Sequence, residues 1–433
     1  MVGVNMVVHD AICECFEGIM LEPCLLQPCF HFAGNTKKQD FGIAKVMDST
    51  AAFAKTTIGT PYYYKVVAVG PSGESLGTQF SGTPGWTKTV AYSCTNAART
   101  FTVPGGITAL QVDAVGAQRT TYLNHDNIAG YDDTYVQTPA KHPMEDLSKL
   151  IMARGLGAAR IGLEMDNYYF TASAFLTLKE NLKSVEFSDT TGLVNWQRAV
   201  KSPTEITYMR RAARIVERMH SVIRDKAEVG MRKNELIADI YHASVFGADG
   251  HWGDYPAIVP MAPSGVDATA PHLTWDDTPL KSGESTFFEI AGAYRRYQCP
   301  QSRTLFLGKP PQKYLDAEKA VLEAVEAGLA HAKPGNLCED IAGAFNRTLN
   351  KLGFEKDSRC GYAIGLSYPP DWGERTMSFR AGDKTVLEAG MTFHFMPALW
   401  LDDGGLEITE PIVITQTGVE CLCTTPRALV VKE

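Results

Sequence analysis

The sequence lacks the features that would assign it to several broad classes of function. Its 433 residues carry a formal net charge of −8 and contain no long basic run, which argues against a nucleic-acid or membrane-surface partner. No stretch approaches the roughly 18 consecutive apolar residues of a transmembrane helix. Residues 1–20 have no basic start and carry acids within their apolar part, so they match a signal peptide poorly. These absences favour a cytoplasmic protein.

The ten cysteines do not form a familiar metal-binding pattern. Cys13, Cys15, Cys24 and Cys29 cluster near the start, but the spacing C-x-C…C-x₄-C is not one that usually holds tetrahedral zinc. The pair formed by Cys421 and Cys423 lies near the end. We interpret all of them as free thiols of a reducing compartment, with zinc in the early group as the alternative.

The character of the sequence changes along the chain. Residues 1–57 have no clean period and stay unassigned. Residues 58–116 are rich in Thr, Ser, Gly, Val and Tyr, and "PYYYKVVAVGPSGES" is similar to the last strands of a fibronectin type III module. From residue 117 the pattern is α/β, with a buried strand expected at 161–163 and a helix from about Thr171.

The clearest helix begins at Pro203. Ser202 is the expected N-cap, proline suits the first helical position, and Glu205 completes a capping box. An apolar stripe follows at 3-4-3-4 spacing, so one face of this helix should be buried. The stripe consists of Ile206, Met209, Ala213, Val216, His220 and Ile223. We interpret His220 as a core or boundary histidine.

Helices and strands alternate in the rest of the chain. Three more amphipathic helices are expected within 230–246, 316–335 and 338–353, the last two closed by Pro-Gly and Gly. Strand candidates lie at 257–262, 285–294, 296–308, 391–400 and 406–415. Helices alternating with long paired strands predict a curved antiparallel sheet flanked by helices, an α+β architecture.

The order of these segments from 201 to 425 resembles the pita-bread domain of methionine aminopeptidases, prolidases and creatinase. "KSPTEI" opens that domain, and "AIVPMAPSGVDATAPH" is similar to the segment that brings a histidine, here His272, to the active site. The segments "GESTFFEIAGAYRRYQCPQSRTLFLG", "GYAIGL", "LEAGMTFHFMPALW" and "GLEITEPIVIT" follow in the family's order. The resemblance implies a pita-bread catalytic domain at 201–433, preceded by a partial creatinase-type α/β domain at 117–200 and by the β-rich segment at 58–116.

The metal ligands of the related peptidases are largely missing. Those enzymes need Asp, Asp, His, Glu and Glu to hold two ions that activate a water molecule. The matching positions here are Glu289, Pro300, Tyr362, Met396 and Thr409. A shift of one residue places Glu410 at the last position, which still gives only two acids. We therefore expect no metal and no other cofactor.

A closer resemblance is to the ectoine hydrolase family, and it covers residues 117–433. It rests on "FFEIAG", "YRRY", "SRT", "YPPDWGERT" and "GLEIT". It implies metal-independent hydrolysis of a cyclic amidine zwitterion, ectoine, by a homodimer. Glu289 is the expected nucleophile or base and His272 the expected proton shuttle.

Several further residues are expected to contact the substrate. Arg375 is the first choice for its carboxylate because a guanidinium binds a carboxylate through two hydrogen bonds, with Arg303 a weaker choice. Tyr362 would supply a hydroxyl and Trp372 would stack on the amidinium. The remaining candidates are Tyr368, Asp371, Glu374, His251 and His394.

Each of these residues also has a structural interpretation. Glu289 would then pair with Arg295 or Arg296, His272 would lie on a surface loop, and Glu374 would pair with Arg375. Alternative functions are a creatinase-like amidinohydrolase, a metallo-dipeptidase, and a non-catalytic ligand-binding protein or truncated pseudoenzyme. The last alternative arises because residues 1–116 differ from the family's usual N-terminal region.

Overall fold

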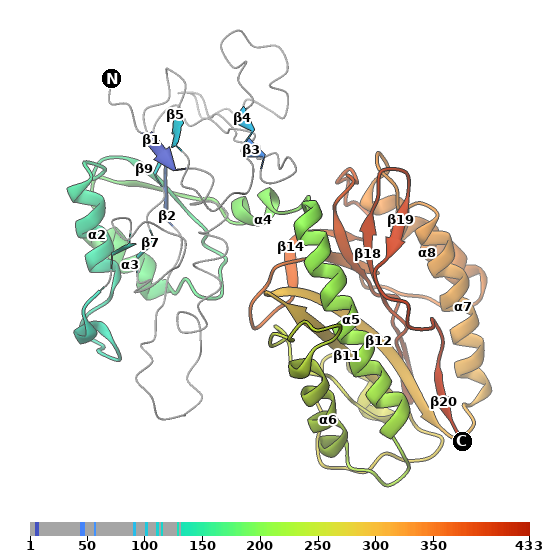
Figure 1. Ribbon diagram of the computed structural model, residues 1–433. Helices are drawn as coiled ribbons and strands as arrows, with labels where there is room; N and C mark the ends of the chain where they lie inside the picture. The colour runs from blue at the N-terminus through green and yellow to red at the C-terminus, as the bar shows by residue number, and fades with distance from the viewer. Residues whose placement is uncertain are drawn as a thin grey trace. The chain divides into compact units, whose positions relative to one another are not determined.

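The computed structural model describes residues 131–433 and, before them, only eight short backbone strands (Figure 1). These strands are β1 (Asn5–Val7), β2 (Ala44–Met47), β3 (Thr56–Thr57), β4 (Val90–Ala91), β5 (Thr100–Thr102), β6 (Leu110–Gln111), β7 (Ala114–Val115) and β8 (Ile128–Ala129). The fibronectin-like segment and the early cysteine group lie largely outside the described residues. The chain divides into two compact units, Met1–Gln197 and Arg198–Glu433.

The described part of the first unit is an α/β arrangement. Its elements are η3 (Asp133–Tyr135), α2 (Met144–Ala153), β9 (Arg160–Leu163), α3 (Ala172–Asn181), β10 (Glu186–Asp189) and α4 (Leu193–Gln197). Strands β9 and β10 are parallel neighbours in a sheet of order β10-β9-β2-β6. Buried residues of α2, β9 and α3 form its core. The strand expected at 161–163 and the helix starting after Thr171, whose hydroxyl accepts a hydrogen bond from Ala174 N, are confirmed.

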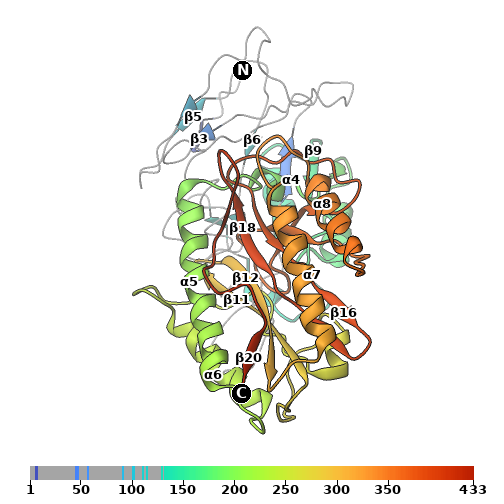
Figure 2. The same cartoon turned by 90° about the vertical axis from the view of Figure 1, so that its right-hand side faces the viewer.

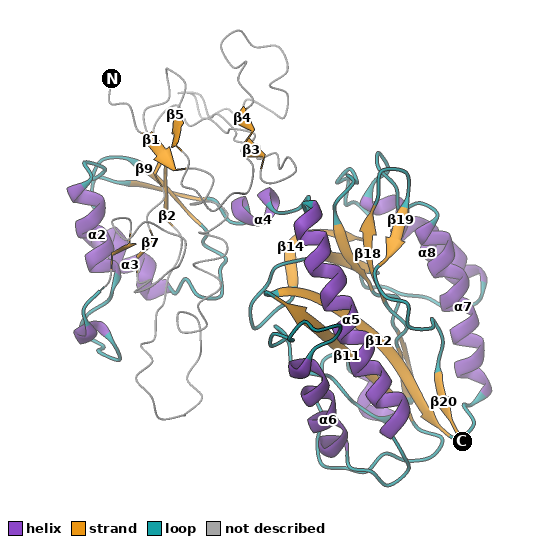
Figure 3. Ribbon diagram, viewed as in Figure 1, coloured by secondary structure: helices purple, strands orange, loops and turns teal. Residues whose placement is uncertain are grey.

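The second unit is built from four long helices and several strands (Figure 3). Its helices are α5 (Pro203–Lys226), α6 (Lys233–Phe246), η4 (Gly265–Thr269), α7 (Gln312–Leu329) and α8 (Cys338–Lys351). Its strands are β11 (Ser285–Tyr294), β12 (Tyr297–Leu307), β13 (Gly361–Ile364), β14 (Gly373–Phe379), β15 (Thr392–Phe395), β16 (Leu399–Leu401), β17 (Gly404–Leu406), β18 (Glu410–Ile414), β19 (Val419–Cys421) and β20 (Val430–Lys432).

The main strands of this unit form two neighbouring sheets. One has the order β11-β12-β20 and the other β14-β13-β15-β18-β19, and every pairing except β12 with β20 is antiparallel. Isolated bridges join β12 to segments next to β18 and β13 of the larger sheet, between Arg303 and Ile408 and between Tyr297 and Leu366. Figure 2 shows these strands between the α5–α6 pair and the α7–α8 pair. The predicted α+β architecture, an antiparallel sheet flanked by helices, is confirmed.

Helix α5 begins as its sequence predicts. The Ser202 hydroxyl accepts a hydrogen bond from Glu205 N at 3.1 Å, and Ser202 N donates to the Glu205 carboxylate at 2.8 Å. The predicted apolar stripe is buried, including His220, whose Nε2 lies 3.3 Å from the carbonyl oxygen of Gln301. Helix α5 therefore packs along β11 and β12, the strands that carry Glu289 and Ser302.

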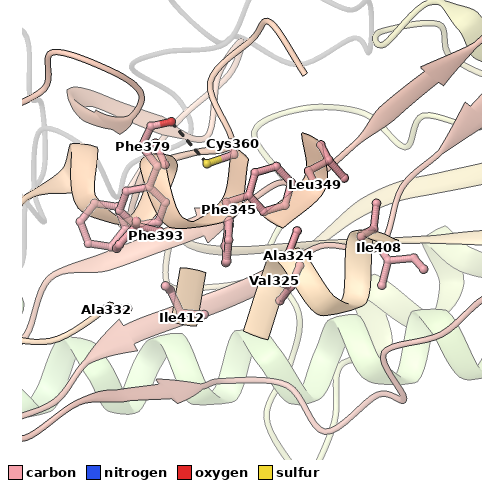
Figure 4. Close-up of a cluster of buried hydrophobic side chains, with 14 of the residues drawn as sticks. Ala324, Val325, Ala332, Phe345, Leu349, Cys360, Phe379, Phe393, Ile408 and Ile412 are labelled. Carbon is pink, nitrogen blue, oxygen red and sulfur yellow. Dashed lines mark hydrogen bonds between the residues drawn. The ribbon is translucent and has the colours of Figure 1, made fainter. Parts of the chain in front are cut away.

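The main hydrophobic core lies where α7 and α8 cover the larger sheet (Figure 4). Phe345 and Leu349 of α8 pack there with Phe379 of β14 and Phe393 of β15. Together with α5 on the other side, this core buries both long strands of the β11–β12 hairpin. Among the described residues, no helix combines the length and the apolar character needed to cross a membrane.

Three strand predictions are wrong in detail. Residues 257–262 form no strand, since Pro260 cannot donate a backbone hydrogen bond and only Met261 makes isolated bridges, to Glu289 and Thr274. The strand expected at 391–400 ends at Phe395 and resumes as β16, with Pro397 in the gap. The strand expected at 406–415 is interrupted at 407–409, which pair with β12 instead.

Candidate active site

Glu289 lies at the centre of the β11–β12 hairpin. Its cross-strand partner is Ser302, so the two side chains leave the hairpin on the same face. Glu289 is only 2% exposed, and burial raises the pKa of its carboxyl well above the ordinary value. The alternative partner Arg296 is engaged elsewhere, with its guanidinium 3.1 Å from the Asp254 carboxylate.

A chain of hydrogen bonds holds an imidazole beside this carboxyl group. Trp372 Nε1 donates to the Tyr362 hydroxyl at 2.7 Å, and that hydroxyl is hydrogen-bonded to His394 Nδ1 at 2.9 Å. His394 Nε2 is hydrogen-bonded to Thr409 Oγ1 at 2.7 Å. Both ring nitrogens therefore have partners, and the orientation of the ring is fixed.

The contact between His394 and Glu289 is not an ion pair at neutral pH. His394 Nδ1 lies 3.8 Å from Glu289 Oε1, beyond hydrogen-bond distance. Burial, followed by the positive charges of Arg359 and Arg303, lowers the pKa of His394 to about 3. The imidazole is therefore neutral. It lies beside the carboxyl group of Glu289 but supplies no positive charge to it.

A second carboxyl group, Glu407, shares this site and was not among the candidates from the sequence. Ser302 Oγ donates to Glu407 Oε2 at 2.6 Å, which places Glu407 on the face of the hairpin that carries Glu289. Burial raises the pKa of Glu407 to about 7, and the charge of Glu407 in turn raises the pKa of Glu289. Each carboxyl group thus disfavours ionisation of the other.

A simple signal in the sequence points to Glu407. Residues two apart on a strand face the same way, and Glu407 stands two residues before Thr409, which the family resemblance implies to be a site position. The structure keeps this relation, because Ser302 N donates to Thr409 Oγ1 while Ser302 Oγ donates to Glu407. The same spacing of two relates His394 to Met396.

Two cationic side chains flank the cluster from the segment after α8. The guanidinium of Arg359 lies 4.5 Å from the ring centroid of Tyr362, and its charge lowers the pKa of His394. Lys356 Nζ donates to the carbonyl of Ala398 at 2.9 Å, and its charge opposes the rise in the pKa of Glu407. Neither residue was predicted from the sequence.

The predicted carboxylate anchors lie in other surroundings. Arg375 is exposed, with φ of 53°, where the pairing of β14 with β13 shifts its register. Glu374 does not depend on Arg375, since its buried carboxylate accepts a hydrogen bond from Lys201 Nζ at 2.5 Å. Arg303 is buried, and its guanidinium lies 2.7 Å from the Glu410 carboxylate. Glu374 and Arg303 therefore stabilise the fold through buried ion pairs.

Three other predicted pocket residues lie in or near ordered turns and aromatic contacts of the second unit. Tyr368 is buried, with its ring centroid 4.7 Å from the guanidinium of Arg296. The Asp371 carboxylate accepts a hydrogen bond from Gly373 N at 2.8 Å, which shapes the turn before Trp372 and β14. His251 is half-buried and packs edge-on against Tyr294, at 5.4 Å between ring centroids.

His272 lies on an exposed turn between η4 and Thr274. Thr274 bridges to Met261, which in turn bridges to Glu289, so the turn belongs to the chain segment beside β11. The imidazole adjacent to Glu289 in the structure is that of His394. The role of His272 as a proton shuttle stays a prediction.

The residues present do not fit the metal centre of a dinuclear peptidase. Of the five matching positions only Glu289 offers a carboxylate, and both nitrogens of the neighbouring His394 are engaged by hydroxyl groups. Hard divalent ions such as Mg²⁺ and Mn²⁺ need several oxygen or imidazole ligands around one point. Within residues 131–433, no group of three or more His, Cys, Asp or Glu side chains is arranged to hold an ion.

The arrangement suits chemistry on a cationic carbon. Two buried carboxyl groups lie on one face of a rigid hairpin, within a shell of hydrogen-bonded aromatic side chains. A cation that enters beside Glu289 would pair with its carboxylate and lower its pKa. Such a site can attack, or direct water to, an electrophilic carbon that carries positive charge.

Comparison with known proteins places this chain in a family. Residues 207–416 match metallopeptidase family M24, and residues 80–200 match the creatinase/prolidase N-terminal domain. The second match begins inside the segment predicted as fibronectin-like. The ectoine hydrolase of Halomonas elongata is 54% identical over 333 residues, which cover 74% of this chain and 82% of that protein. An uncharacterized hydrolase/peptidase of Sinorhizobium fredii, y4tM, is 40% identical over 322 residues, with the same two coverages.

Solved structures agree on the fold. The Xaa-Pro dipeptidase from Bacillus anthracis superimposes with a TM-score of 0.60 at 23% identity, over 78% of this chain and 90% of that one. At this identity the likeness concerns the fold alone. The shared fold is the predicted one, a pita-bread domain preceded by a creatinase-type N-terminal domain. The chain therefore belongs to the ectoine hydrolase branch of metallopeptidase family M24.

Proposed function

We propose that this protein hydrolyses ectoine, a cyclic amidine that also carries a carboxylate, to an N-acetylated diaminobutyrate. The single observation that carries the proposal is the buried carboxyl of Glu289 at the centre of a family site whose other metal-ligand positions are Pro300, Tyr362, Met396 and Thr409. The relative from Halomonas elongata, which is named ectoine hydrolase, supports the choice of substrate.

The chemistry follows from the charge of the substrate. The amidinium carbon is electrophilic, but its positive charge is spread over two nitrogens, so water attacks it slowly. The carboxyl of Glu289 has a raised pKa because burial disfavours its charge. The amidinium reverses this effect by ion pairing, and the resulting carboxylate adds to the carbon or removes a proton from the attacking water.

The reaction is proposed to need no metal, with proton transfer as the remaining requirement. His272 is the proton shuttle predicted from the sequence, and its exposed turn beside Met261 and Thr274 would have to close over the substrate for that role. The creatinase-like alternative differs in its substrate, an open guanidinium instead of a cyclic amidinium. Parallel assays with ectoine and creatine separate the two.

The test is turnover of ectoine by the full-length protein, followed by chromatography of the amine product. Wild type should convert ectoine, and Glu289→Gln should lose activity by at least about a thousandfold because an amide is neither nucleophile nor base. Glu323→Gln, an exposed glutamate on α7, is the matched control and should keep full activity. Absence of turnover by wild type would favour a non-catalytic ligand-binding protein, and full activity of Glu289→Gln would refute the role of this carboxyl.

Two further properties belong to the same proposal. The protein is proposed to act in the cytoplasm, where the free cysteines Cys299, Cys338, Cys360, Cys421 and Cys423 stay reduced. It is also proposed to be a homodimer, as the family resemblance implies. A molar mass of the full chain measured by light scattering tests the second point, since a monomeric mass contradicts it.

A further inference from the structure

Glu407 is the buried acid of the site for which the proposed function gives no role. Its side chain is 1% exposed, and one oxygen, Oε2, accepts a hydrogen bond from Ser302 Oγ at 2.6 Å. The other oxygen, Oε1, has no hydrogen-bond partner among the described residues. A buried carboxyl oxygen without a partner is costly to the fold, so a role in binding or proton transfer explains its presence better than stability does.

The position of Glu407 is fixed by the elements that carry the nucleophile. Glu407 N donates to Thr304 Oγ1 at 2.7 Å, and Thr409 N donates to the carbonyl of Ser302 at 3.1 Å. The segment 407–409 is thereby held along β12, opposite the strand that carries Glu289. The backbone positions of Glu407 and Glu289 are therefore both fixed relative to β12.

The other titratable groups of the site are poor proton donors at neutral pH. Burial lowers the pKa of His394 to about 3, so its ring holds no spare proton, and burial raises the pKa of Tyr362 well above its ordinary value. Lys356 faces Glu407 from the segment after α8, and its charge favours the ionised form of that carboxyl. Glu407, with a pKa raised to about 7, holds a proton and can release it near neutrality.

We propose that Glu407 is the proton donor for the departing ring nitrogen, through the unpartnered Oε1, while Glu289 acts on the amidinium carbon. This inference rests on the proposed function and assigns to Glu407 the proton transfer that the sequence had assigned to His272. It also explains why two acids that raise each other's pKa lie on one face of the hairpin.

The proton balance of the reaction closes with these two acids when water is the attacking group. Glu289 takes a proton from water as the C–O bond forms, and the π electrons of the C–N bond move to nitrogen. The bond to the departing nitrogen then breaks with its electron pair on nitrogen, which receives the proton of Glu407. The hydroxyl proton returns to Glu407 as the amide carbonyl forms, and Glu289 gives its proton to the free amine.

The first test compares Glu407→Gln with wild type in ectoine turnover across pH. The amide keeps the shape and the contact with Ser302 but cannot donate a catalytic proton. We expect kcat to fall about 10²- to 10⁴-fold with little change in KM, and the fall in wild-type kcat at alkaline pH to be absent from the variant. Ectoine binding measured by calorimetry shows that the variant retains a formed site.

The second test uses Ser302→Ala, which keeps both acids. The hydrogen bond from Ser302 lowers the pKa of Glu407, so its removal should raise that pKa and move the alkaline limb of kcat up by about one pH unit. A merely structural role of Glu407 would lower activity without moving the limb. This variant also decides the matter if Glu407→Gln does not fold.

The outcomes separate this inference from the function on which it rests. Turnover by wild type, loss in Glu289→Gln and normal kcat in Glu407→Gln would overturn the role of Glu407 alone. An unmoved alkaline limb in Ser302→Ala would overturn it as well. A wild-type protein that leaves ectoine intact overturns the proposed function first, and the role of Glu407 with it.

Discussion

The residues around Glu289 provide no positive charge to pair with its carboxylate, so a cationic substrate would supply that charge. Glu289 and Glu407 are buried, each raises the cost of ionising the other, and the neutral His394 offers no counter-charge. An ionised Glu289 is therefore unfavourable until a cation binds. A neutral cyclic analogue of the same size could not stabilise the ionised carboxylate. Such a site therefore selects an amidinium by its charge as well as by its shape.

The substrate carboxylate needs a cation of its own, and the structure favours Arg359 over Arg375. The guanidinium of Arg359 covers the ring of Tyr362, whose hydroxyl contacts His394. Arg375, the choice from the sequence, lies on the irregular part of β14. Both arginines are exposed, so the preference rests on the stacking of Arg359 against Tyr362. We predict that Arg359→Ala raises KM for ectoine by about 10- to 100-fold, with a smaller change in kcat. This range corresponds to the loss of one charge-assisted hydrogen bond or of a bidentate pair.

Arg375→Ala is the matched variant, since it removes the same side chain from the neighbouring segment. Steady-state kinetics of both variants on ectoine decide between the two residues. A large rise in KM for Arg375→Ala with an unchanged Arg359→Ala would restore the prediction made from the sequence. The thermal midpoint of each variant shows whether either change acts through the fold.

Among the elements, the β11–β12 hairpin is the one on which the site depends, and α5 holds it in place. Gly292, three residues after Glu289, lies where α5 crosses the strand. A Cβ atom at this position would lie 2.2 Å from the carbonyl oxygen of Ala212 and 2.6 Å from Val216 N, both backbone atoms of α5. The helix can approach the strand this closely only because residue 292 has no side chain.

We predict that Gly292→Ala lowers both stability and activity. The added methyl group must push α5 away from β11, which should reduce the free energy of unfolding by about 1–3 kcal/mol and disturb the position of Glu289. Gly343→Ala in α8 is the control, because its Cβ would meet only the flexible Arg347 side chain at 3.0 Å. Urea unfolding and ectoine turnover check both variants, and equal behaviour of the two would contradict the close-packing explanation.

The elements also show what the sequence can predict. The start of α5 is encoded locally, in Ser202, Pro203 and Glu205, so its boundary was predicted correctly. The break at 407–409 depends instead on pairing with β12, a strand about a hundred positions earlier in the chain. No local pattern reports that pairing. The spacing of two from Thr409 points to Glu407, but the sequence alone does not show that this segment leaves its strand and pairs with β12. Similarly, the packing that draws His394 toward Glu289 arises from strand order in the sheet.

The whole molecule keeps the architecture of a metallopeptidase family while its central residues have changed. The matches to family M24 and to the creatinase/prolidase N-terminal domain cover most of residues 80–416. Within the second unit, the ligand positions implied by the resemblance carry the carboxyl of Glu289, two hydroxyl groups and two apolar side chains, and His394 lies beside them. The fold thus supplies a buried, rigid face, and the side chains on it decide the chemistry.

The final prediction concerns the metal dependence of the full-length protein. A site with one carboxylate at five ligand positions should bind Mn²⁺ or Co²⁺ weakly, because a divalent ion needs several ligands to replace its hydration shell. We expect ectoine turnover to survive dialysis against excess chelator, and added Mn²⁺ or Co²⁺ to produce no cleavage of Xaa-Pro dipeptides. A metal-dependent dipeptidase treated in parallel verifies that the chelator works. Loss of ectoine turnover on chelation, with recovery on adding one of these ions, would contradict the proposal and place a metal at Glu289, because that carboxylate is the one acid left among the five positions.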